Sequence, residues 1–170
     1  MNKLFFLLSL AALAFTPLGA RAQNTPAMVG SGPHGYDFLI GKWTCTNSMP
    51  SPMGGPATTA LSVAKGADGS LFIHSTATGY DSAGYVGYAP KTKIWSNPAT
   101  FGTGNTSYEW TQQTGKTTTW TGSYFVAASH KTTSIRDTYT IAGMTSFSDL
   151  SQAQTGGVWK TVAKTTCTKS

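Results

Sequence analysis

The chain has 170 residues, and its 12 lysines and arginines against 6 acidic residues give a formal net charge of +6. This length suits one domain with one core, to which the 39% of hydrophobic residues contribute. The basic residues are dispersed and form no cluster that would follow a phosphate backbone, which argues against nucleic-acid binding.

The first 22 residues have the pattern of a signal peptide. Lys3 precedes an apolar run at residues 4–18, and Ala20-Arg21-Ala22 fits the small-residue cleavage rule. The run is short for a membrane span, and an uncleaved N-terminal anchor is the alternative. We therefore predict an exported protein, periplasmic or secreted, with no stable membrane insertion after cleavage.

The exported part begins with a leader. Residues 23–35 are rich in proline and glycine and are predicted to be flexible. The stretch 34–40 suits a short helical turn in front of the first strand. A single folded domain is expected over residues 36–170.

Beyond residue 41 the composition is typical of an all-β protein. Threonine, serine, glycine, tyrosine and tryptophan dominate, and turn signals recur about every ten residues. About ten strands in meander order predict a closed antiparallel up-and-down barrel, because closure leaves no unpaired edge. The predicted strands are Lys42–Asn47, Thr58–Lys65, Leu71–Thr78, Gly84–Ala89, Lys93–Thr100, Thr106–Gln113, Thr117–Ala127, Thr132–Ile141, Thr145–Ser151 and Val158–Thr168.

Alternate residues of a strand share a face, so the apolar face of each strand is expected to line the barrel interior. Aromatic side chains on these faces are candidate ligand contacts, since an aromatic cavity suits a small apolar or planar molecule. The alternative is that they only fill the core, as in small barrels. The candidates are Trp95, Tyr108, Trp110, Trp120, Tyr124 and Tyr139.

Two cysteines, Cys45 and Cys167, follow the signal peptide. Exported proteins meet oxidising conditions, so a disulfide is expected, with two free thiols as the alternative. Cys45 comes two residues after the inward Trp43, and Cys167 shares a face with Trp159 and Ala163. In a closed meander the first and last strands are neighbours, so the cysteines are predicted to meet inside the seam.

The head of the first strand carries a resemblance. Gly41-Lys42-Trp43 after a helical turn resembles the Gly-x-Trp start of the calycin superfamily, which includes the lipocalins. The fuller pattern is similar to a bacterial family of exported proteins of unknown function, and it implies a calycin-like barrel with a cavity. Its segments are YDFLIGKW at 36–43, GYAPKTKIW at 87–95, RDTYT at 136–140 and GGVWK at 156–160.

The resemblance also carries structural expectations. Nitrobindin-like barrels are distant relatives that bind haem through a C-terminal histidine, and this chain has no histidine after His130, so no cofactor is expected. Gly41 is expected to permit the turn into the first strand. Lipocalin-like barrels often stack an arginine over the Gly-x-Trp tryptophan, which makes Arg136 over Trp43 a structural hypothesis.

Asp137 and His74 are the polar candidates. Asp137 is the only acidic residue on an inferred inward face, so the carboxylate pair of a glycosidase is expected to be missing. His74 shares a face with Phe72 and is a candidate for the cavity. The wide histidine spacing predicts no metal site, and no nucleophile or phosphate-loop motif is present.

Three functions are compatible with these patterns. The favoured one is a small-ligand-binding barrel without catalysis, whose partner is a small apolar or aromatic molecule. The alternatives are a hydrolase-type enzyme that uses Asp137 and His74 at the barrel mouth, and a ligand-free structural or envelope protein. Residues 38–43 are expected to close one end of the barrel, so the functional site is expected at the other end.

Overall fold

The computed structural model describes residues 34–50 and 55–170, so the predicted signal peptide and most of the leader lie outside it. No helix in this part of the chain is both long and apolar enough to cross a membrane. The short 3₁₀ helices η2 (Asp37–Leu39) and η3 (Ala127–Ser129) accompany ten strands. These are β1 (Gly41–Asn47), β2 (Thr58–Lys65), β3 (Leu71–Ala77), β4 (Tyr80–Ala89), β5 (Ile94–Phe101), β6 (Thr106–Thr111), β7 (Thr117–Val126), β8 (Lys131–Gly143), β9 (Ser146–Thr155) and β10 (Val158–Lys169).

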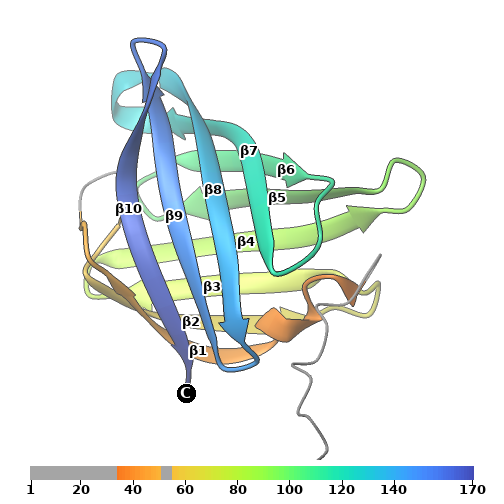
Figure 1. The fold of residues 1–170 in the computed structure, drawn as a ribbon. Coiled ribbons are helices and arrows are strands. Elements are labelled where there is room, and N and C mark those ends of the chain that lie inside the picture. The colour runs from red at the N-terminus through yellow and green to blue at the C-terminus, as the bar shows by residue number, and fades with distance from the viewer. Residues whose placement is uncertain (1–33, 51–54) are drawn as a thin grey trace, which may run out of the picture.

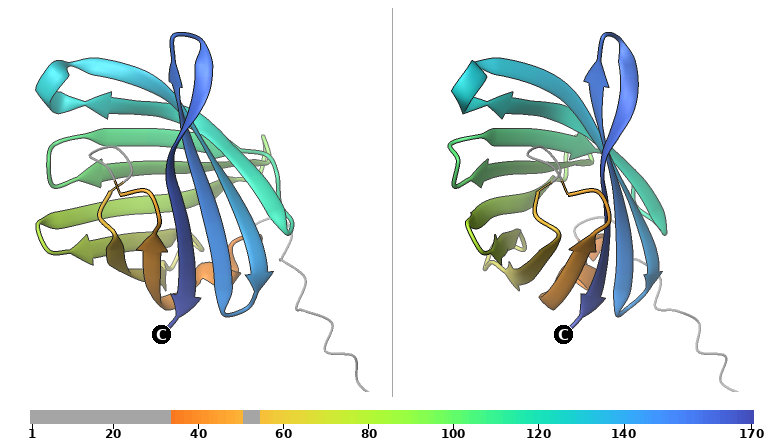
Figure 2. Two further views of the ribbon diagram at one scale, coloured as in Figure 1. Left: turned by 60° about the vertical axis from the view of Figure 1, so that its left-hand side comes forward. Right: turned by 90° about the vertical axis from the view of Figure 1, so that its left-hand side faces the viewer.

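The strands form a closed antiparallel barrel, which confirms the predicted fold class. Each strand pairs with the next along the chain, and β10 returns to pair with β1. In Figure 1, β8, β9 and β10 run steeply while β2 to β6 run across the view. The β9–β10 hairpin projects beyond the rest of the barrel (Figure 2).

Strand bounds follow most of the predicted ones closely. β9 continues to Thr155 instead of ending at Ser151, and the other large difference is at the start of β4. This strand begins at Tyr80 instead of Gly84, because Thr78 and Gly79 form a tight turn that pairs Tyr80 with Ala77. The hairpin thereby extends the wall at the end of the barrel that lies opposite η2.

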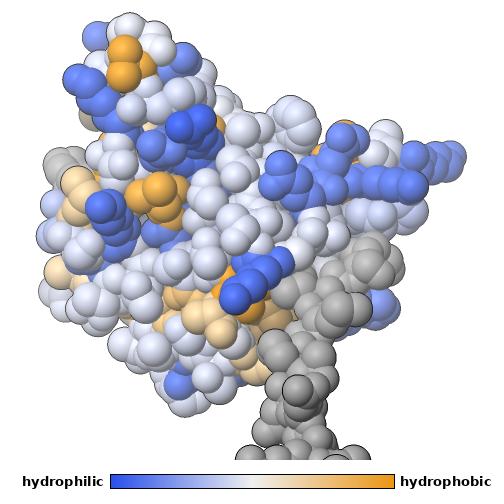
Figure 3. All heavy atoms as spheres, viewed as in Figure 1, coloured by the Kyte–Doolittle hydropathy of each residue, from blue (hydrophilic) through white to orange (hydrophobic). Residues whose placement is uncertain are grey.

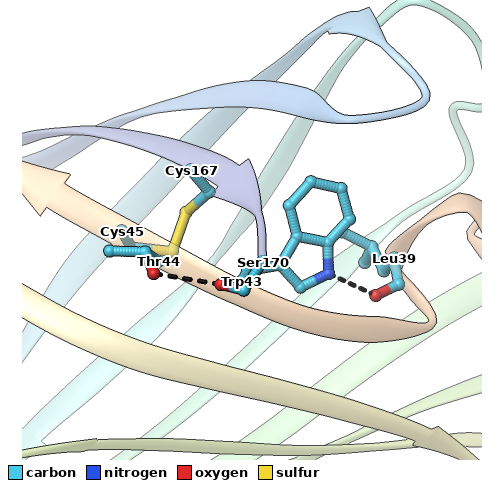
Figure 4. The surroundings of a disulfide bond; sticks show 6 residues. All are labelled: Leu39, Trp43, Thr44, Cys45, Cys167 and Ser170. Carbon is cyan, nitrogen blue, oxygen red and sulfur yellow. Dashed lines mark hydrogen bonds between the residues drawn. A yellow bond between two sulfur atoms is a disulfide. The ribbon is translucent and has the colours of Figure 1, made fainter.

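The chain segment before β1 closes one end of the barrel, as predicted. Phe38 and Leu39 of η2 are buried, and the Trp43 side chain is only 1% exposed. The Trp43 indole Nε1 donates a hydrogen bond to the Leu39 carbonyl oxygen at 2.7 Å, which fixes η2 to the first strand (Figure 4). Phe147 packs edge-on against Trp43 with ring centroids 5.0 Å apart. We call this buried end the plug.

The barrel closes at the seam between β1 and β10. Cys45 and Cys167 are direct partners in the strand register and form a disulfide, which confirms the predicted pairing (Figure 4). Both cysteines are buried, so the bond lies on the inner side of the wall. Gly41 begins β1 with a φ of +132°, a conformation that favours glycine, as its predicted role requires.

The proposed stacking of Arg136 on Trp43 is wrong. The Arg136 guanidinium lies 4.5 Å from the ring centroid of Trp159, and its Nε donates to the Gln152 side chain at 2.7 Å. Lys169 takes the place over Trp43, with Nζ 5.1 Å from the ring centroid. Arg136 cannot reach the plug because it faces outward, next to the inward Asp137.

The same contact shows that Trp159 is outside the barrel, contrary to the prediction that it faces inward with Ala163. The register of β10 shifts between Thr161 and Ala163, and this irregularity reverses the alternation. Ala163 and Cys167, beyond the shift, are buried as expected.

Candidate functional site

The barrel interior is open at the end opposite the plug. A cavity of about 900 Å³ extends inward from the turns that connect β3 to β4 and β5 to β6. We call it the outer chamber. Its wall combines aromatic side chains such as Phe101 and Tyr124 with polar ones such as Asn105 and Ser107. The predicted location of a site, away from residues 38–43, therefore coincides with the larger opening of the barrel.

A second, smaller cavity of about 250 Å³ lies between the outer chamber and the plug. We call it the inner chamber. Its wall is mostly apolar and includes Phe38, Leu61 and Phe147. Tyr139 and Asp149 line both chambers, so the two spaces adjoin. The lumen thus passes from a polar mouth to an apolar base.

Three carboxyl groups lie together on the wall of the outer chamber: Glu109 on β6, Asp137 on β8 and Asp149 on β9. We call this group the acidic wall. The strand register places Asp137 opposite Ser151 and Asp149 opposite Tyr139. Ser151 Oγ donates to Asp149 Oδ2 at 3.0 Å. Glu109 is only 4% exposed, which is unusual for a glutamate without a basic partner.

Gly122 explains how Glu109 reaches Asp137. It lies on β7, between their strands, and is the register partner of Glu109. A Cβ at position 122 would lie 1.9 Å from the Tyr108 carbonyl oxygen, so β6 and β7 approach too closely for any side chain. The two carboxyl groups are close enough across this gap for each to change the other's pKa.

Burial makes the acidic wall hard to ionise. It raises the pKa of Asp137 to about 6, partly offset by hydrogen bonds with Ser151 and Glu109. Burial also raises the pKa of Glu109 well above its usual range, and the charge of Asp137 raises it further. The pKa of Asp149 is raised well above its ordinary value by burial first and then by the charge of Asp137. The ionisation of one of these groups therefore opposes the ionisation of its neighbours.

Several acceptor oxygens on this wall have no hydrogen-bond partner in the protein. They are Glu109 Oε1, Asp149 Oδ1 and Asn97 Oδ1, all of them buried. Asn97 is the register partner of Glu109 on β5, so these two side chains are neighbours. A buried acceptor without a donor is costly, and its presence calls for an explanation.

Four of the predicted cavity residues lie in the lumen. Tyr124, Asp137 and Tyr139 line the outer chamber, and Trp120 and Tyr139 line the inner one. Trp95 is buried but lines neither chamber: its ring packs edge-on against Tyr36, with centroids 4.8 Å apart. Trp95 is therefore a core residue, which is the alternative predicted from the sequence for these aromatics.

The inward orientation predicted for Tyr108 and Trp110 is wrong. Their side chains are 50% and 44% exposed, and Glu109 and Thr111 occupy the inner face of β6. When one face of a short strand carries the aromatic residues, hydrophobicity predicts that this face points into the barrel. Here the aromatics lie on the outer wall, and the carboxyl group is inside.

His74 is not in the lumen. Its imidazole is 54% exposed, and Nε2 lies 2.9 Å from Asp81 Oδ1. The neighbouring Ile73 packs against the core, so alternation turns His74 to the outer surface. His74 and Asp137 therefore lie on opposite sides of the barrel wall, and the acid–base pair predicted for the enzyme alternative is not formed.

Glu109 and Asp149 are the site residues that sequence reasoning missed. Asp149 could have been found, because it shares a face with Phe147, which is apolar and inward. Glu109 carried no such signal, as the apolar face of its strand points outward. The expectation that Asp137 lacks a second carboxyl group is accordingly wrong, because Glu109 and Asp149 line the same chamber.

The outer surface offers no competing site on the face drawn in Figure 3, where apolar side chains occur in small groups among hydrophilic ones. Within residues 34–50 and 55–170, no group of three or more histidine, cysteine, aspartate or glutamate side chains could hold a metal ion. The acidic wall is thus not arranged as a metal centre.

Comparison with known proteins adds information on the fold. No protein-family model matches the chain, and no curated protein matches it. Among solved structures, it is similar to the crystal structure of Rv2717c from M. tuberculosis, with a TM-score of 0.57 and 16% sequence identity. The match covers 78% of this chain and 93% of that one. At this identity the likeness shows a shared barrel fold alone.

Proposed function

We propose that the protein is an exported binding protein that holds a small molecule, at least partly apolar or aromatic, in the lumen of its barrel. The observation that carries this proposal is the outer chamber of about 900 Å³, open at one end and continuous with an apolar inner chamber. Cavities of this size accommodate small organic ligands. A purely structural barrel has no need of such a space.

The calycin-like character of the sequence supports the same conclusion, since lipocalins are ligand-binding barrels of related design. Export rests on the N-terminal pattern at residues 1–22 and agrees with the Cys45–Cys167 disulfide, which persists in oxidising compartments. Fractionation of the source cells tests export: we expect a mature chain that begins at Gln23. A chain that retains Met1 in the cytoplasm would contradict this part of the proposal.

Binding is tested with a matched pair of variants. Ala99 lines both chambers, and the adjacent Thr100 is exposed on the outer wall. Ala99→Phe fills the lumen, whereas Thr100→Phe adds the same ring outside. With N-phenyl-1-naphthylamine as a neutral aromatic dye, we expect Ala99→Phe to lower affinity by about tenfold or more and Thr100→Phe to leave it unchanged.

Native mass spectrometry of protein purified from its source organism would identify a retained molecule. Equal dye binding by both variants, together with the absence of a retained molecule, would remove the support for a lumen site. If both variants lose dye affinity equally, circular dichroism of each protein shows whether unfolding is the cause.

A further inference from the structure

We propose that the acidic wall binds the protonated amino group of a small organic amine whose apolar part occupies the inner chamber. This inference rests on the proposed function and specifies its ligand class. Glu109 and Asp149 supply the contacts to the amino group, and the aromatic side chains around them hold the rest of the molecule.

The distribution of charge is the first argument. The protein is basic, yet three of its six acidic residues, the members of the acidic wall, line the outer chamber. No lysine, arginine or histidine is found among the described residues that line either chamber. A lumen lined by carboxyl groups and by no described basic side chain suits a cation, whose charge favours the ionised form of these carboxyls, and it disfavours an anion.

The unpartnered oxygens are the second argument. Glu109 is 96% buried, and its Oε1, Asp149 Oδ1 and Asn97 Oδ1 are all acceptors without donors in the protein. An ammonium group has three N–H donors and no acceptor, so it satisfies such oxygens without leaving a lone pair of its own. Charge-assisted hydrogen bonds of this kind are stronger than neutral ones.

The surroundings of the acidic wall decide between an organic cation and a metal ion. No described cluster is suited to a metal. Asp149 and Tyr139 line both chambers, so a cation at this depth has an apolar space directly beside it. Tyr139 and Tyr124 line the same chamber, and aromatic rings attract cations.

The experiment uses three probes of similar shape: 2-phenylethylamine, 2-phenylethanol and 3-phenylpropanoate. Isothermal titration at pH 7.5 and low salt compares them on the wild-type exported chain. We expect the amine to bind about tenfold more tightly than the alcohol, and the carboxylate to bind more weakly than either.

Two variants test whether the acidic wall causes the preference for the amine over the alcohol. Glu109→Gln and Asp149→Asn each remove a charge with little change of shape, and each is expected to reduce the amine-over-alcohol preference at least several-fold while alcohol binding persists. Asp68→Asn is the matched control, because Asp68 lies in the β2–β3 turn outside the lumen and its loss changes the net charge equally. Should one lumen variant fail to fold, the other carries the test.

The outcomes separate the two proposals. If the alcohol binds the wild type as tightly as the amine and Ala99→Phe abolishes both, the lumen binds ligands but the inference about amines is overturned. The same holds if the amine preference survives in both lumen variants. If none of the three probes binds at millimolar concentration, the proposed function fails together with the inference.

Discussion

Glu109 and Asp137 belong to strands that are not neighbours, and their carboxyl groups meet across Gly122 of the intervening strand. The contact exists because β7 carries no side chain at this point. It joins the two halves of the acidic wall, and its protonation changes with pH. Several measurable properties of the barrel depend on it.

The free energy of unfolding is expected to fall as the pH rises through the range in which the Glu109–Asp137 pair loses its protons. The folded-state pKa of Asp137, about 6, exceeds its unfolded value near 4, so the folded protein binds more protons between them. The resulting stabilisation is present below pH 4 and lost as the pH rises past 6. Urea unfolding at pH 4.5 and 7.5 should show a smaller difference for Asp137→Asn than for the wild type, by up to about 3 kcal/mol. An unchanged difference would contradict the burial of this carboxyl group.

Gly122→Ala should destabilise the barrel strongly. A Cβ at position 122 meets the backbone of Tyr108 and Glu109, which cannot move without separating β6 from β7. We expect a loss of about 2 kcal/mol or more in the free energy of unfolding, measured by denaturant titration. Gly143→Ala is the control, since a Cβ there meets nothing within 4 Å. Equal stability of the two variants would refute the close approach of β6 and β7.

The plug depends on one indole hydrogen bond. Trp43→Phe leaves the Leu39 carbonyl oxygen without its donor and opens space beside Phe147. The expected loss is about 2 kcal/mol in the free energy of unfolding. Trp110→Phe, on the exposed outer wall, should change it by less than about 0.5 kcal/mol. The comparison also tests which tryptophan faces inward.

The disulfide closes a loop with a sequence separation of 122 residues. In the chain-entropy model such a bond contributes at most about 5 kcal/mol. The Cys45→Ala/Cys167→Ala double variant should therefore unfold at a lower guanidinium concentration than the wild type. Dithiothreitol should lower the midpoint of the wild type and leave that of the double variant unchanged. A wild-type midpoint that is insensitive to reduction would show that strand pairing alone holds the seam.

Much of the fold could be predicted because its signals are local. Turn residues separate short alternating runs, and ten such runs in a chain of this length close most simply into a meander barrel. The Cys45–Cys167 pairing followed from closure, since only adjacent first and last strands bring these residues together. The outward position of Trp159 did not follow, because a one-residue irregularity near Val162 reverses the alternation and leaves no mark in composition.

The candidate site was less predictable for a related reason. Alternation divides a strand into two faces, and hydrophobicity is then used to choose the inner one. This choice fails in β6, where Tyr108 and Trp110 lie outside and Glu109 lies inside. A cavity reverses the usual rule, because a lumen that binds a polar group must be lined by polar side chains. The strand on which Tyr108 and Trp110 misled the sequence reasoning is therefore the one that supplies Glu109, a polar residue of the cavity.

The seam has a further consequence for how the protein avoids pairing with other chains. In the described barrel every strand pair but β1–β10 joins neighbours in sequence. Opening that pair would turn the ring into a curled sheet with two free edges, each a row of unsatisfied backbone groups able to pair with other chains. The Cys45–Cys167 bond prevents this opening. It thus protects the protein from self-association through these two strand edges.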